Sequence, residues 1–329
     1  MTAPVLVTGG TGFVGGALVR RLLADGRDVR VLTRSDRGAA TMAALGASPE
    51  MGELGDAAAL RAAMAGVGTV FHAAGVNAMC LRDTAELFRT NVDGSEHVMR
   101  AAADAGVQRV VYTSSAATIG EPEGMIGRED SAHRGSFLSA YERSKYLAEA
   151  RVREVADRLG LPVVIVNPSS VQGPGRVGGS ARLLLGLVNA RLPVVVPTFV
   201  SIVDVDDCTQ GHVLAERRGA AGSRYLLNGA TLSVAEAVAL LRTIAGRPRR
   251  VLTLPRSFAR AGGRVAAAAS RLSGRELPVC PELVRTLLHG HRYDGSLATR
   301  DLGLRYRPIE ETVRRTLAWY ADQGLVRRP

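Results

Sequence analysis

One lysine stands out among the residues that could do chemistry. Lys145 is the only lysine among 42 basic residues in a chain of 329, and all the others are arginine. It follows Tyr141 by four residues, so on a helix the two side chains lie on one face. Arginine carries the same charge on a larger, planar group, whereas an ammonium is a compact point charge. The composition therefore indicates that position 145 requires an ammonium, as an active site can. An ammonium close to a phenol lowers the pKa of that phenol from about 10.

A glycine-rich turn near the N-terminus has the spacing of a dinucleotide-binding motif. Gly9, Gly12 and Gly15 form a GxxGxxG pattern between a predicted strand, residues 3–8, and a predicted helix, residues 17–24. Glycine permits the dihedral angles of such a turn, lets the backbone approach a pyrophosphate and lets the helix pack closely on the strand. The phosphates would then bind N–H groups at the positive end of the helix.

The end of the next predicted strand, residues 28–33, indicates which dinucleotide is preferred. An acidic side chain there would bind the ribose hydroxyls of NAD, but this chain has Arg34, with Arg37 nearby. A guanidinium pairs well with a 2′-phosphate. The sequence therefore predicts NADP(H), with NAD(H) as the alternative because Asp36 could still reach a ribose.

Predicted strands and helices alternate through the first half of the chain. Short apolar runs at residues 69–72, 108–114 and 162–166 are separated by helical segments. Apolar strands joined through helices are typical of a parallel sheet with right-handed crossovers, covered on both faces. The expected fold class is therefore α/β, a doubly wound parallel sheet of the Rossmann type. The helices expected after the glycine turn are residues 37–45, 56–64, 84–105 and 139–159.

The alternation loosens about half-way along the chain, which predicts a second, smaller lobe. We expect an NADP-binding domain of residues 1–172 plus segments near 199–230. Residues 173–198 and 231–329 are expected to form a discontinuous C-terminal lobe, in which residues 255–281 are helical. Ligands bind at the carboxyl ends of the strands in such folds, so this lobe should roof the substrate.

The composition narrows the class of protein and its partners. The net charge is +11, but no zinc-finger, helix-turn-helix or aromatic RNA-binding pattern accompanies it, so we expect no nucleic-acid partner. An arginine-rich solvated surface is expected, and an anionic partner is the open alternative. No apolar run is long enough to span a membrane, and the N-terminus has no signal-peptide pattern, so a cytoplasmic location is expected. Cys80, Cys208 and Cys280 are far apart and form no CxxC pair, which argues against a disulfide framework and a zinc site and suits a reducing compartment.

Several motifs follow one another in a familiar order. They are residues 8–15, His72-Ala73-Ala74-Gly75, Asn91-Val92-Asp93-Gly94, Tyr112-Thr113-Ser114-Ser115-Ala116 and Tyr141-xxx-Lys145. In the order and spacing of these motifs, the chain resembles the extended short-chain dehydrogenases/reductases, which belong to the NAD-dependent epimerase/dehydratase superfamily. The likeness covers nearly the whole chain. It is greatest to dihydroflavonol-reductase-like, 3β-hydroxysteroid-dehydrogenase-like and sugar-epimerase-like members.

This resemblance implies a catalytic set. Tyr141 would donate a proton to a carbonyl oxygen, or remove one in the reverse direction. Lys145 would lower the tyrosine pKa and bind the nicotinamide ribose. Ser115, preferred over its neighbour Ser114, would hold the substrate oxygen. Asn91 would support the proton relay or, alternatively, brace a helix beside the sheet.

The resemblance also completes the set of expected ligand contacts. Asn77 would contact the substrate, together with Ser115 and Tyr141. With those argued above, the expected cofactor contacts are Gly9, Thr11, Gly12, Phe13, Val14, Arg34, Arg37, Glu53, Leu54, Ala73, Ala74, Gly75, Tyr141, Lys145, Pro168 and Ser170.

The expected activity is NADP(H)-dependent reduction of a ketone or aldehyde to an alcohol, or the reverse, by hydride transfer. An epimerase of a nucleotide-linked sugar is the first alternative, although it would usually need an acidic residue where Arg34 stands. A sugar dehydratase is disfavoured, because Ala116 and Ala117 stand where such relatives carry acidic groups. A non-catalytic dinucleotide-binding protein is the remote alternative. The partner expected is a small-molecule carbonyl or alcohol, and a homodimer through the 84–105 and 139–159 helices is compatible with the resemblance.

Overall fold

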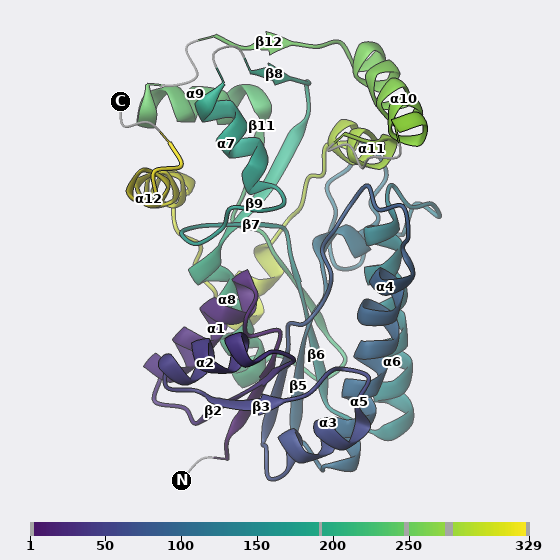
Figure 1. Cartoon of the computed structure of the whole chain (residues 1–329), viewed down its shortest axis with the longest axis vertical. Coiled ribbons are helices and arrows are strands. Elements are labelled where there is room, and N and C mark those ends of the chain that lie inside the picture. The colour runs from purple at the N-terminus through teal and green to yellow at the C-terminus, as the bar shows by residue number, and fades with distance from the viewer. Residues whose placement is uncertain (1–2, 191–192, 247–249, 274–278, 327–329) are drawn as a thin grey trace.

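A seven-stranded parallel sheet forms one end of the molecule, and a smaller lobe lies beyond the carboxyl ends of its strands (Figure 1). The computed structural model describes residues 3–190, 193–246, 250–273 and 279–326. In the strand order β10-β6-β5-β4-β1-β2-β3, β4 is central and β1 lies beside it, so the order reverses between β1 and β4, as in a Rossmann fold. The expected doubly wound α/β fold is thus confirmed. The strands are β1 (Val5–Thr8), β2 (Val29–Thr33), β3 (Ser48–Met51), β4 (Thr69–His72), β5 (Arg109–Thr113), β6 (Val163–Pro168) and β10 (Arg224–Leu227).

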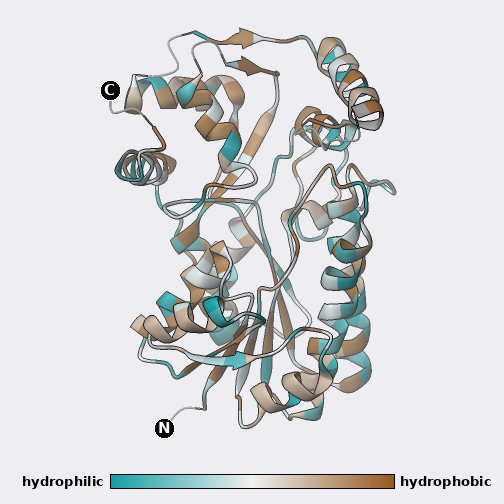
Figure 2. Ribbon diagram, viewed as in Figure 1, coloured by the Kyte–Doolittle hydropathy of each residue, from teal (hydrophilic) through white to brown (hydrophobic). Residues whose placement is uncertain are grey.

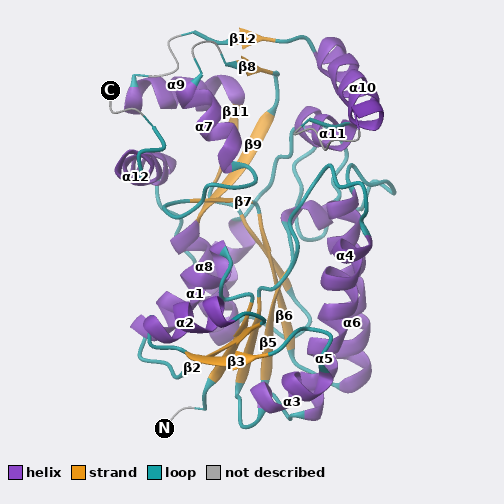
Figure 3. Ribbon diagram, in the orientation of Figure 1, coloured by secondary structure: helices purple, strands orange, loops and turns teal. Residues whose placement is uncertain are grey.

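Helices cover both faces of this sheet, which explains why its central strands are apolar throughout (Figures 2 and 3). Successive residues of β1 point to opposite faces: Val5 and Val7 pack in one core and Leu6 in the other. The first core is closed by α1 (Phe13–Ala24), α2 (Asp36–Ala44) and α8 (Val205–Arg218). The second is closed by α3 (Ala57–Met64), α5 (Gly94–Asp104) and α6 (Ala140–Leu159).

The helix predicted at residues 84–105 is not one regular helix. α4 (Ala85–Phe88) runs into a π-helical segment, η1 (Arg89–Asp93), and then into α5. A π turn widens the helix locally and is frequent at functional sites. This one contains the buried side chain of Asn91.

The upper lobe is built on a second, three-stranded sheet. β7 (Ser170–Gln172), β9 (Phe199–Asp204) and β11 (Ala230–Ser233) form it in the order β11-β9-β7. α8 and β10 return to the main sheet between β9 and β11. The division of the chain into two domains stays a prediction. No helix in the described part of the chain is long and apolar enough to cross a membrane.

The remaining elements of the upper lobe are mainly helical. A core around Tyr320 joins three of its helices. The helix expected at residues 255–281 is observed as α10, followed by residues 274–278, which lie outside the described residues, and by the start of α11. The other elements of this lobe are α7 (Ala181–Asn189), β8 (Val194–Val195), α9 (Val234–Ala245), β12 (Leu252–Thr253), α10 (Arg256–Ser273), α11 (Pro281–His289) and α12 (Ile309–Asp322). The π segment η3 (Ala298–Leu302) packs instead in the first core of the main sheet.

A disulfide joins the two lobes, so the expectation of unpaired cysteines is wrong. Cys80, in the loop after β4, is bonded to Cys280, the N-cap of α11, across 200 residues of sequence. Glu282 of α11 strengthens the same junction, because its carboxylate accepts hydrogen bonds from the N–H groups of Cys80 and Ala140. The spacing of the cysteines in the sequence could not predict this disulfide, because only the fold brings Cys80 and Cys280 together. The cysteines therefore give no support to a reducing compartment.

We expect the double variant Cys80→Ser, Cys280→Ser to lose about 2–5 kcal/mol of free energy of unfolding, because a cross-link that closes a long loop restricts the unfolded chain. Urea unfolding without a reductant measures the loss. A reductant should destabilise the wild type by a similar amount and leave the double variant unaffected. Equal stability of the two proteins under oxidising conditions would contradict the cross-link.

Candidate functional site

The glycine turn between β1 and α1 is shaped for close contact with other backbone. Gly9 has a φ of +73°, and a Cβ there would lie 2.6 Å from backbone atoms of Ala74. A Cβ on Gly15 would lie 2.2 Å from the carbonyl oxygen of Gly9. α1 starts at Gly12 without a side-chain cap, so N–H groups of its first turn remain for an anion. The turn therefore fits a dinucleotide pyrophosphate, and the predicted contacts Thr11, Phe13 and Val14 lie on it.

The predicted contacts of the 2′-phosphate, Arg34 and Arg37, lie where β2 leads into α2, next to the glycine turn. α2 approaches the glycine turn so closely that a Cβ on Gly38 would lie 3.1 Å from the Thr11 side chain. Arg34 and Arg37 flank this corner and are exposed. Neither guanidinium has a partner among the described residues. Both are therefore available to a phosphate.

Other predicted ligand contacts lie along the carboxyl edge of the sheet. Glu53 is exposed and Leu54 half-buried in the segment after β3. Pro168 is buried at the end of β6, and the Ser170 hydroxyl already donates to Ser180. The predicted substrate contact, Asn77, is exposed in the loop after β4. Their contacts with ligands stay predictions.

Ser115 and Tyr141 meet just beyond the end of β5. The Ser115 side chain lies beside the Tyr141 hydroxyl, where it acts to lower the pKa of Tyr141. The hydroxyl of Ser114 points elsewhere and donates to the Glu149 carboxylate at 2.6 Å. The geometry therefore favours Ser115 over Ser114 as the partner of the tyrosine.

Lys145 is buried next to the end of β5. Its Nζ donates to the carbonyl oxygen of Thr113 at 2.8 Å and lies 3.4 Å from the Tyr112 hydroxyl. Burial lowers the pKa of Lys145 to about 8, and the Glu149 carboxylate opposes this shift. The only lysine is thus held in the interior instead of being left on the solvated surface.

The pKa of Tyr141 shifts in the opposite direction to the sequence expectation. Burial raises it, while the neighbouring Ser115 side chain and the charge of Arg176 act against that rise. Among the described residues, Lys145 donates hydrogen bonds towards β5 and none to Tyr141. The ammonium therefore does not lower the tyrosine pKa in this state, and the phenol stays protonated at neutral pH.

Asn91 braces the loop that follows β4. Its Oδ1 accepts a hydrogen bond from the Val76 N–H at 2.7 Å, and its Nδ2 donates to the Val76 carbonyl at 3.0 Å. The same Nδ2 donates to the Ser144 hydroxyl of α6 at 2.9 Å. A Cβ on Gly75 would lie 3.1 Å from Asn91 Oδ1 and 3.9 Å from Lys145 Nζ. These contacts agree with the expected alternative that Asn91 braces a helix beside the sheet. A part in a proton relay stays a proposal.

Glu149 is a residue of this region that the sequence reasoning missed. It lies eight residues after Tyr141 on α6 and is buried. Burial acts to raise its pKa, but its hydrogen-bond donors and the neighbouring arginines hold that pKa below its usual value. Its spacing from Tyr141 and Lys145 could have indicated it, because residues four apart lie on the same face of a helix. The Glu149 carboxylate accepts hydrogen bonds from Ser114, Thr118, Asn167, Arg153 and Arg224.

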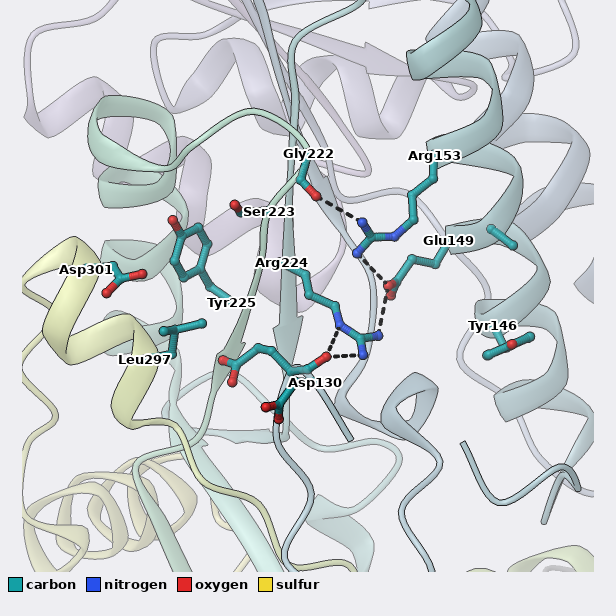
Figure 4. A pocket seen from close by; sticks show the side chains of 12 residues that line it. Asp130, Tyr146, Glu149, Arg153, Gly222, Ser223, Arg224, Tyr225, Leu297 and Asp301 are labelled. Atoms are coloured by element: carbon teal, nitrogen blue, oxygen red, sulfur yellow. Dashed lines mark hydrogen bonds and ion pairs between the residues drawn. The ribbon is translucent and has the colours of Figure 1, made fainter. Parts of the chain in front are cut away.

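A pocket opens beside Glu149, between α6 and β10. Figure 4 shows Arg153 and Arg224 reaching across it to the Glu149 carboxylate. Ser115, Tyr141 and Lys145 do not line this pocket. We therefore do not assign it to the reaction.

Arg176 lies between the glycine turn and Tyr141. Its guanidinium lies 5.3 Å from the centre of the Phe13 ring and donates to the Val171 carbonyl at 2.7 Å. Its charge favours the ionised form of Tyr141. Because the chain is rich in arginine, nothing in the sequence singled this residue out.

Comparison with known proteins identifies the family. Residues 5–227 match the model of the NAD dependent epimerase/dehydratase family. The chain belongs to this family. Membership confirms the resemblance carried by the motifs. Together with the reductase names of its relatives, it makes the chain an NAD(P)-dependent oxidoreductase that uses a nicotinamide dinucleotide.

Similar family members are matched over nearly their full length. A protein of Synechocystis sp. named as a dihydroflavonol 4-reductase is 34% identical, with 98% of this chain and 95% of the relative covered. The 2-alkyl-3-oxoalkanoate reductase of Stenotrophomonas maltophilia is 31% identical, with 95% and 98% covered. The crystal structure of gox2253 superposes with a TM-score of 0.87 at 31% identity, covering 99% of this chain and 100% of that one.

Proposed function

We propose that this family member is an NADP(H)-dependent carbonyl reductase that converts a ketone or aldehyde into an alcohol, or catalyses the reverse reaction. The observation that carries the proposal is the placement of Ser115 beside Tyr141, with Lys145 buried on the same helix as the tyrosine. The nicotinamide, when bound, supplies or accepts the hydride. The reductase names of the relatives support the same reaction class.

The proposed roles follow from the surroundings of each side chain. Ser115 orients the substrate oxygen, and Tyr141 gives it a proton. The raised pKa of Tyr141 keeps its hydroxyl protonated and ready to donate. The Lys145 ammonium stabilises the phenolate that remains once it turns from the Thr113 carbonyl towards Tyr141, because charges interact strongly in a buried site. Asn91 acts as a positioning residue through Val76 and Ser144.

NADP(H) is the proposed cofactor because Arg34 and Arg37 are exposed and unpaired within the described part of the chain. We expect Arg34→Ala to weaken NADPH binding about 10- to 100-fold and to change NADH binding little, since a charge-assisted hydrogen bond contributes about 1.5–3 kcal/mol. Fluorescence titration of both reduced dinucleotides measures the effect. Arg61→Ala, at an exposed arginine of α3, is the matched control. Equal losses for NADPH and NADH would contradict the role of Arg34.

A nucleotide-sugar epimerase is the second candidate, because the family's description includes that activity. It predicts interconversion of sugar nucleotides without net consumption of NADPH. A homodimer through α5 and α6 also remains a proposal. Light scattering on the purified protein measures its mass directly.

A further inference from the structure

Three side chains that the proposed reaction does not use converge near the boundary between the lobes. Glu121 lies in the loop after η2 (Ala116–Ile119), His289 ends α11, and His291 follows it. Nδ1 of His291 lies 2.6 Å from Oε1 of Glu121, and Nε2 of His289 lies 3.3 Å from the same oxygen. One donor atom from each of the three residues lies within 4.8 Å of the others.

The carboxylate of this cluster is buried and only partly satisfied. Glu121 is 1% exposed. Its second oxygen, Oε2, has no hydrogen-bond partner among the described residues. Burying a carboxylate oxygen without a partner is costly. A cation bound by both carboxylate oxygens of Glu121 would supply the missing interaction.

Backbone contacts hold the two segments in place. Gly127 and Tyr293 form a parallel β-bridge. The Gly127 N–H donates to the Arg292 carbonyl at 2.8 Å, and the Asp294 N–H donates to the Gly127 carbonyl at 3.0 Å. The segments that carry Glu121 and the two histidines are therefore aligned by the fold itself, as a ligand site requires.

We propose that Glu121, His289 and His291 bind a divalent transition-metal ion, for which Zn²⁺ is the best match. Imidazole nitrogens and a carboxylate oxygen are characteristic zinc donors. Bonds of about 2.0–2.2 Å in a tetrahedron place neighbouring donor atoms about 3.3–3.5 Å apart. The separations of 2.6 and 3.3 Å from Glu121 Oε1 approach this geometry, and the two histidine nitrogens lie within 4.8 Å of each other, so small side-chain movements would complete it.

The site leaves a fourth position for water or a small ligand. The Tyr293 hydroxyl lies 2.9 Å from His291 Nδ1 and would border that position. A bound ion would connect the loop that follows Ser115 and η2 to the segment after α11. It would thereby add a second cross-link between the lobes, besides the Cys80–Cys280 disulfide.

The test is a metal titration of untagged protein that has been dialysed against a chelator. We expect one equivalent of Zn²⁺ to bind by calorimetry, and Co²⁺ to give the visible absorption of a four-coordinate N/O site. His289→Ala and His291→Ala should each weaken Zn²⁺ binding at least about 100-fold, since losing even a supporting group costs about 10- to 100-fold. His97→Ala, at an exposed histidine of α5, should bind like the wild type.

Two further measurements separate this site from the alternatives. The Cys80→Ser, Cys280→Ser variant should keep its Zn²⁺ affinity, which excludes reduced thiols as the ligands. Zn²⁺ should raise the melting temperature of the wild type and not that of either histidine variant. No stoichiometric binding by the wild type would overturn the proposal, and so would unchanged affinity in both histidine variants. The wild-type titration decides the first point even if a variant fails to fold.

Discussion

Replacing Lys145 by arginine is expected to lower kcat at least about 100-fold while the protein stays folded. The chain uses arginine at every other basic position, yet Lys145 is 5% exposed and its Nζ lies 5.0 Å from the centre of the Tyr112 ring. A planar guanidinium is larger than an ammonium and cannot occupy the same position beside Gly75 and Tyr112. General acid–base catalysis contributes about 10²- to 10⁴-fold, and most of that contribution should be lost.

The control for this variant is the reciprocal change on the same helix. Arg143→Lys replaces an exposed side chain two residues earlier and should keep full activity. Steady-state kinetics with NADPH and an accepted carbonyl measure kcat, and circular dichroism with thermal unfolding confirms the fold. Near-normal turnover of a folded Lys145→Arg protein would show that the lone lysine is a compositional accident.

Replacing Tyr141 by phenylalanine is expected to lower kcat by about 10²- to 10⁴-fold, because the substrate oxygen loses its proton donor. NADPH binding should stay close to that of the wild type, because the variant keeps the ring of Tyr141 and the lost hydroxyl lies beside Ser115. Lys145→Arg, in contrast, should also weaken NADPH binding if the ammonium contacts the ribose. The two variants therefore differ in a binding measurement that is independent of turnover.

Tyr146→Phe is the matched control for Tyr141→Phe. Tyr146 is half-buried on the same helix, with its ring against His133 and Phe137. The Tyr146→Phe variant should therefore keep most of the wild-type activity. If Tyr141→Phe were as active as Tyr146→Phe, another group would have to be the proton donor, and the proposed mechanism would fail.

The centre of the fold could be predicted from the sequence, whereas its edge could not. β4, β5 and β6 are apolar because helices cover both faces of the sheet. β3, at the edge, has the sequence Ser-Pro-Glu-Met and carries no such pattern. The π segment η1 could not be predicted either, because a π turn changes the hydrogen-bond spacing of a helix and not the types of residues in it.

The site could be predicted where its residues are close in sequence. Gly9 to Gly15 and the pair Tyr141 and Lys145 each belong to one turn or one helix. The choice of Ser115 over Ser114 came from the family motif, and the reason appears only in the structure, where Ser114 donates to Glu149. The sequence singled out neither Glu149 nor the glycine-turn contact of Arg176.

Contacts between distant segments could not be predicted. Cys80 and Cys280 are separated by 200 residues, and Glu121 meets His289 and His291 only because the chain returns from α11 to the end of the main sheet. The expectation of no metal site rested on the cysteines alone, and the sequence does not show that Glu121 lies beside His289 and His291.

The measurement that tests the central claim most directly is a carbonyl screen with the wild-type protein. Aryl ketones, steroids and small aldehydes are mixed with NADPH, and the absorbance of the reduced nicotinamide is followed while the alcohol product is quantified. We expect at least one carbonyl to be reduced, with one NADPH consumed for each alcohol formed. No NADPH consumption with any carbonyl, together with interconversion of a sugar nucleotide without net redox change, would contradict a carbonyl reductase.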